Sequence, residues 1–88
     1  MARVWIPSLL RDLTGGQEVL DVPGQKVRDV IDELDHRFPG IRERLCAGNS
    51  LRPGMTVVVG TQVSRLGLSQ PIEPDSEVHF LPALSGGQ

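Results

Sequence analysis

Apolar and polar side chains alternate near both ends of the chain, which is the pattern of half-buried β-strands. The alternation predicts a first strand over 3–7 and a last strand over 77–82. Pro82 has no N–H group to donate to a neighbouring strand, so pairing should end there. The side chains that this pattern turns toward a core are Val4, Ile6, Val78 and Phe80.

A second pattern, with apolar residues three and four positions apart, occupies 27–38 and predicts an amphipathic helix. Its apolar stripe consists of Val27, Val30, Ile31, Leu34 and Phe38. The opposite side is charged, with Asp35 among its acids, and reads as an ordinary solvated face. Pro39 and Gly40 end the helix, and a further turn is expected up to Asn49.

Three more short segments have strand character. Residues 17–22 follow a glycine turn at Thr14–Gly16, and 55–59 are β-branched and nearly all apolar. A hairpin at Gly60–Thr61 leads from the latter into Gln62–Val63. The order β, β, α, β, β, β predicts an α+β fold: a mixed sheet of four to five strands with one main helix packed on one face.

The end of the chain has little to bury. We therefore expect one folded domain over 1–82 and a flexible C-terminal tail over 83–88, where two glycines leave the backbone free. Fully extended, Ala83 to Gly87 would reach roughly 17 Å at about 3.3 Å per residue, enough to enter another protein's active site. A frayed, solubilising end is the alternative on composition alone.

Composition narrows the function classes. The chain has 88 residues and a net charge of -2 without a basic patch, which argues against nucleic acid or an anionic membrane as partner. No apolar run is long enough for a membrane span, and a single cysteine, Cys46, fits a reducing compartment, so we expect a cytoplasmic protein. Neither a metal-ligand spacing nor a nucleophile–base pair is present, so the chain should bind no metal or cofactor and should not be an enzyme alone.

Three blocks of the sequence resemble the ubiquitin-like bacterial sulfur carriers of the MoaD/ThiS/CysO family, most closely the CysO-like branch. The blocks are Val4–Arg11 with Thr14–Gln17, Val30–Leu34 with Pro39–Leu45, and Glu77–Gly87. The last is the most specific, because the family ends in an apolar strand, a proline and Gly-Gly. The resemblance implies a β-grasp fold, in which the first and last strands lie side by side. The chain departs from the family at Val59-Gly60-Thr61, where Val-Asn-Gly is usual.

The resemblance also implies a mechanism. A MoeB/ThiF-like adenylyltransferase would use ATP to adenylate the carboxylate of Gly87, and sulfide or persulfide sulfur would convert it to a thiocarboxylate. A pyridoxal-phosphate-dependent, cysteine-synthase-like enzyme would then accept the sulfur. ATP and pyridoxal phosphate belong to these partners. The residues that would enter a partner's active site are Leu84, Ser85, Gly86 and Gly87.

Gln88 is the larger departure, because most carriers end at the second glycine. A carboxylate displaced by one residue should not reach the adenylating phosphate in the same pose. We expect a precursor from which a JAMM-type zinc metalloprotease cleaves the Gly87–Gln88 bond. The alternatives are a residue added during cloning and a variant that has lost activation.

A docking surface is predicted near the origin of the tail. Leu81, Trp5 and Pro7 should share the sheet face opposite the helix, and an exposed apolar patch there would serve a partner. The alternative is that the loop over 9–13 covers Trp5. His79 is expected to be solvated on the same face, and Cys46 to be a small buried hydrophobe.

Other functions stay open on the sequence alone. One is the small subunit of molybdopterin synthase, whose tail would stay inserted in a large catalytic partner. Another is a ubiquitin-like modifier joined through Gly87 to lysines of other proteins. A plain interaction module is the third.

Overall fold

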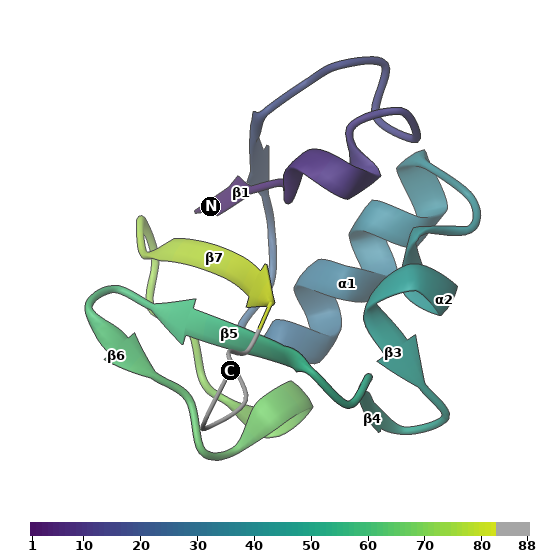
Figure 1. Cartoon of the computed structure of the whole chain (residues 1–88). Helices are drawn as coiled ribbons and strands as arrows, with labels where there is room; N and C mark the ends of the chain where they lie inside the picture. The colour runs from purple at the N-terminus through teal and green to yellow at the C-terminus, as the bar shows by residue number, and fades with distance from the viewer. Residues whose placement is uncertain (83–88) are drawn as a thin grey trace.

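One mixed sheet of five strands organises the protein, and the computed structural model describes residues 1–82. The strand order is β2-β1-β7-β5-β6 (Figure 1). The strands of this sheet are β1 (Ala2–Trp5), β2 (Val19–Val22), β5 (Met55–Val59), β6 (Gln62–Val63) and β7 (Glu77–Pro82). Two 3₁₀ turns, η1 (Ser8–Leu10) and η2 (Gly67–Ser69), lie in the connections.

The last strand, β7, is central to the sheet. It pairs in parallel with β1, with Val4 opposite Val78, and antiparallel with β5, with Val57 opposite Phe80. The predicted neighbourhood of the first and last strands is therefore confirmed, as is the extent of β7. Because side chains alternate along a strand, this register turns all four of these residues toward the same side of the sheet.

The helix α1 (Val27–Arg37) covers that side (Figure 1). Four of the five predicted stripe residues are fully buried, and Phe38, the residue after the helix, packs against the core from its edge. Because the apolar stripe of α1 packs on the apolar face of the sheet, one apolar core forms between the sheet and α1. The largest core residues with under 2% exposure are Phe80, Ile6, Ile31, Leu34, Ile41, Leu45, Val4, Val22, Val27, Val30, Val57 and Val78.

A short second helix, α2 (Ile41–Leu45), is fixed by Asp35. One carboxylate oxygen of Asp35 accepts hydrogen bonds from the backbone N–H groups of Gly40 and Arg42, both at 3.1 Å. Gly40 has a φ of 104°, which a side chain would oppose. Asp35 is therefore a capping residue of the α1–α2 turn, and its prediction as ordinary solvated surface was wrong.

The segment after α2 also differs from the expected turn. It forms a two-stranded sheet of β3 (Cys46–Ala47) and β4 (Ser50–Leu51). Strands of two residues are too short to show alternation, so periodicity could not reveal them. In the described part of the chain, no helix is long and apolar enough to cross a membrane.

Candidate functional site

The predicted reacting end of the chain, Leu84 to Gln88, lies outside the described residues. What the structure gives is the surface from which this end departs. Strand β7 carries the chain to Pro82 in the middle of the sheet, with β5 paired alongside it as far as Met55 opposite Pro82. The site is therefore built around the carboxyl end of β7.

A groove opens beside that end because β1 stops early. The parallel pairing ends with Trp5 opposite His79; the backbone N–H of Ile6 then donates to Glu18 O at 2.8 Å. Pro7 has no N–H to continue the ladder, and the chain turns into η1. The strand predicted over 3–7 therefore ends two residues earlier, at Trp5, and Pro7 borders the groove instead of extending the sheet.

The groove has a volume of about 490 Å³ and is mostly apolar. It brings together all three residues that the sequence predicts for docking, Trp5, Pro7 and Leu81. Leu81 is 44% exposed, which is unusual for a large apolar side chain in a central strand. Residues that the sequence reasoning missed also line the groove, namely Leu9, Arg11, Arg44 and Met55.

Leu9 is the most exposed apolar side chain of the groove, at 83%. It lies in η1, where the backbone N–H of Leu10 donates to Pro7 O at 2.9 Å. Successive side chains of a 3₁₀ turn point in directions about 120° apart, so burying Leu10 turns Leu9 outward. The loop therefore adds an apolar wall to the groove, whereas the sequence reasoning had considered it only as a cover for Trp5.

The outer face of the sheet carries one row of mainly apolar side chains that crosses every strand. The register places Trp5 opposite both Val19 and His79, and Val58 opposite both His79 and Val63. Because no helix covers this face in the described residues, the row stays partly accessible. It joins the groove through Trp5 and His79.

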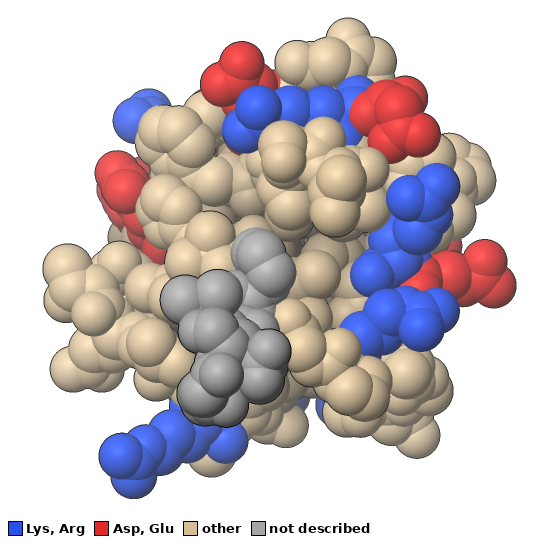
Figure 2. All heavy atoms as spheres, in the orientation of Figure 1, with Lys and Arg blue, Asp and Glu red and all other residues tan. Residues whose placement is uncertain are grey.

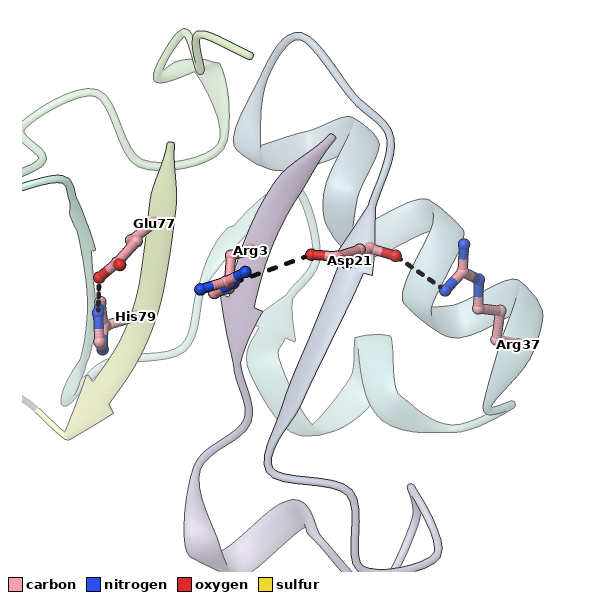
Figure 3. A network of polar contacts seen from close by, with 5 residues as sticks. All are labelled: Arg3, Asp21, Arg37, Glu77 and His79. Atoms are coloured by element: carbon pink, nitrogen blue, oxygen red, sulfur yellow. Dashed lines mark hydrogen bonds and ion pairs between the residues drawn. The ribbon is translucent and has the colours of Figure 1, made fainter. Parts of the chain in front are cut away.

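The neighbouring row of outer-face side chains, nearer the start of β7, is charged (Figure 3). Asp21 lies between two arginines: Arg3 Nε is 4.0 Å from its carboxylate, and Arg37 donates to its backbone oxygen at 3.2 Å. Glu77 contacts His79 at 3.6 Å. Exposed pairs of this kind contribute little to stability, roughly 0–1 kcal/mol. Along β7, the outer face thus changes from charged at its start to apolar at the groove.

His79 is not simply solvated, so that prediction was wrong. Its ring stacks on the indole of Trp5, with centroids 5.2 Å apart and planes 9° from parallel. Its side chain is 30% exposed. The stack holds Trp5 beside the groove, while Trp5 Nε1 is buried without an acceptor among residues 1–82. Within the described part of the chain, this indole donor is therefore unsatisfied.

Cys46 lies at the start of β3 and is buried, as predicted. Burial raises the pKa of its thiol above the usual value, because a thiolate is poorly solvated there, and three nearby guanidinium groups only partly oppose this. The thiol is therefore protonated at neutral pH and is a poor nucleophile. Residues 1–82 also contain no group of three or more His, Cys, Asp or Glu side chains that could hold a metal ion.

The sequence model of the ThiS family matches residues 4–87, nearly the whole chain. The chain belongs to the ThiS family. The match includes the end of β1 together with η1, α2, β5 and β7, which supply residues that line the groove, and it extends through the two terminal glycines.

Individual relatives agree with this placement. The chain is 35% identical over 89 aligned residues to the sulfur carrier protein CysO of Mycobacterium tuberculosis, with 96% of each chain covered. The crystal structure of that protein superposes with a TM-score of 0.87 at 32% identity, covering 96% of this chain and 100% of the other. A chain of the Amycolatopsis orientalis BexX/CysO complex superposes with a TM-score of 0.89 at 31% identity, covering 99% and 100%. These structures confirm the predicted ubiquitin-like β-grasp fold.

Proposed function

We propose that this ThiS-family chain is a sulfur carrier whose C-terminal carboxylate, at Gly87, is activated and then converted to a thiocarboxylate. The observation that carries the proposal is the match to CysO over nearly the full length of both chains. The position of the groove supports it, because the chain emerges from β7 beside an apolar surface that a partner enzyme can grip.

The proposed chemistry has two steps, both on partner enzymes. A carboxylate oxygen of Gly87 attacks the α-phosphorus of ATP, and pyrophosphate leaves. Sulfide then attacks the acyl carbon of the adenylate, and AMP leaves with the bonding electron pair of the C–O bond. The chain itself supplies the carboxylate and the docking surface. This division agrees with the described residues, among which Cys46, the single thiol, is buried and protonated.

Partner enzymes would supply the rest. We assign ATP binding to a MoeB/ThiF-like adenylyltransferase, and acceptance of the sulfur to a pyridoxal-phosphate-dependent, cysteine-synthase-like enzyme. Structural support for partner binding comes from the A. orientalis relative, which was crystallised in a complex with BexX. The molybdopterin-synthase and protein-modifier alternatives stay predictions.

Gln88 has to be removed before activation in this scheme. It places the terminal carboxylate one residue too far along the chain, and misplacement of a reacting group by even about 1 Å can lower a rate about a hundredfold. A JAMM-type zinc metalloprotease would hydrolyse the Gly87–Gln88 peptide bond. Intact mass of the protein from its native host tests this step, since Gln88 retained in every molecule would contradict it.

We expect the chain ending at Gly87 to support ATP–pyrophosphate exchange by a MoeB/ThiF-like enzyme, and the chain ending at Gln88 to support it at a rate at least about a hundredfold lower. A chain ending at Gly86 is the matched control, because its carboxylate is displaced by one residue in the other direction. All three keep residues 1–82, so their melting temperatures should agree.

Two outcomes would contradict parts of this scheme. Equal exchange with the Gly87 and Gln88 forms would overturn the need for processing but keep the carrier function. Absence of exchange with the Gly87 form, in the presence of folded protein and active enzyme, would overturn the carrier function.

A further inference from the structure

Two arginines border the mostly apolar groove beside β7, although the whole chain has a net charge of -2. Among residues 1–82, its ionisable lining residues are Arg11, Arg44 and His79, and none of the lining side chains is a carboxylate. Figure 2 shows basic side chains, with acidic ones beside them, on the side of the molecule that α2 occupies, next to an uncharged surface. The groove therefore combines apolar walls with a basic border.

The two arginines, Arg11 and Arg44, differ in whether their side chains have hydrogen-bond or ion-pair partners within the protein. Arg11 Nε donates to Ile6 O at 3.2 Å, which fixes this guanidinium against the β1–η1 connection. Arg44 has neither a hydrogen-bond partner for its side chain nor an ion-pair partner among residues 1–82. Its neighbours on the same side do have partners: Arg42 pairs with Asp32, and Arg52 donates to Glu43 O at 2.7 Å.

The backbone that carries Arg44 is held firmly. Ile41 and Leu45 are buried at the two ends of α2, and the carboxylate of Asp35 anchors the first turn through two backbone N–H groups. Arg44 therefore projects from a fixed element, not from a loose loop. A partner that bonds to its guanidinium has only the side chain to order, which limits the entropic cost of binding.

We infer that Arg44 determines which partner the groove accepts, by pairing with a carboxylate of the docking segment. The inference rests on the proposed function. The occupant is a segment of the adenylating enzyme that places an apolar side chain between Leu9 and Leu81 and a neighbouring Asp or Glu on Arg44. Charge complementarity selects this occupant, since a planar guanidinium binds a carboxylate through two parallel hydrogen bonds.

The ion pair between Arg44 and the partner's carboxylate should affect binding of the partner more than the chemical step. A border charge mainly changes how often and with which partner a complex forms, and it acts less at high salt. Arg44 is not among the reacting groups, so its effect belongs in the KM for the carrier, with kcat unchanged.

The test measures ATP–pyrophosphate exchange by the MoeB/ThiF-like enzyme, with the chain ending at Gly87 as the varied substrate. Arg44→Glu should raise the KM for the carrier about ten- to a hundredfold at low salt, and Arg44→Lys should raise it less because the charge remains. The difference from wild type should shrink as salt is added. Arg65→Glu is the matched control, since Arg65 is exposed, carries the same charge and does not line the groove.

Each other outcome overturns the inference in a recognisable way. If Arg44→Glu and Arg65→Glu change the KM equally, Arg44 does not determine the partner, while exchange by the wild type keeps the proposed function. If the KM for ATP rises and that for the carrier does not, the guanidinium meets a nucleotide phosphate and not a carboxylate. If the wild type supports no exchange, the proposed function fails and the inference falls with it.

Discussion

Leu81→Asp is expected to leave the protein folded and to lower kcat/KM for adenylation of the Gly87-terminated chain about a hundredfold or more. Leu81 is 44% exposed on the outer face of β7, so the aspartate meets solvent and not the core. The loss arises because a charge in an apolar docking groove has to be desolvated when the partner binds. Well-packed anchor residues of this kind contribute about 2–4 kcal/mol to binding. Pyrophosphate exchange at varied carrier concentration measures the effect.

Leu66→Asp is the matched control for Leu81→Asp. Leu66 is also exposed, at 59%, but it precedes η2 and does not line the groove. The control should retain exchange within about threefold of wild type, as expected for a surface change of under about 0.5 kcal/mol. Circular dichroism should show both variants folded. Exchange unchanged by Leu81→Asp would remove the groove from the account, whereas equal losses in both variants would point to a general surface effect.

Leu34→Ala should lower the free energy of unfolding by about 2–5 kcal/mol. Leu34 is fully buried in the middle of α1, where that helix meets the sheet. Removing most of its side chain leaves a cavity between α1 and the sheet, which the closely packed neighbours cannot fill. A domain of this size has roughly 5–15 kcal/mol of stability in total, so the loss is a large share. Urea unfolding followed by circular dichroism gives the value.

Leu9→Ala removes the same atoms from an exposed position and serves as the control. Leu9 is 83% exposed, so its truncation should change the free energy of unfolding by under about 0.5 kcal/mol. The pair separates core packing from the general effect of removing a leucine. A similar stability change in the two variants would contradict the burial of α1 against the sheet.

The fold could be predicted where its elements are long enough to repeat a pattern. Helix α1 and strand β7 each repeat their apolar spacing at least once, and both appear at the expected positions. The hairpin formed by β3 and β4 could not be predicted, because two-residue strands contain no period. The role of Asp35 was also hidden, since an acid near a helix end looks the same whether it is solvated or caps the next turn.

For the candidate site, the sequence predicts the direction of individual side chains but not the residues that they contact. Trp5 and Leu81 alternate away from the core in their own strands, so their outward direction follows from the sequence alone. The partners of these residues depend on tertiary arrangement. The Trp5–His79 stack requires the parallel register of two strands from opposite ends of the chain, and Arg44 reaches the groove only because α2 packs where it does.

The carboxyl end of β7 is the part of the fold on which the proposed function depends. The two neighbouring strands hold β7 in the centre of the sheet, but β1 leaves it at Trp5 and the groove begins there. The polarity of the outer face changes along the same strand, from the charged surroundings of Glu77 to the apolar surroundings of Leu81. A partner that binds the apolar end is thereby placed next to the point where the chain leaves the domain.

The most direct test of the account is the intact mass of the Gly87-terminated chain after incubation with a MoeB/ThiF-like enzyme, ATP and sulfide. The account predicts a mass increase equal to the exchange of one oxygen for one sulfur, which is absent without ATP and forms at least about a hundredfold more slowly with the chain ending at Gln88. An unchanged mass for the Gly87-terminated chain, under conditions in which the enzyme thiolates an established carrier, would contradict it.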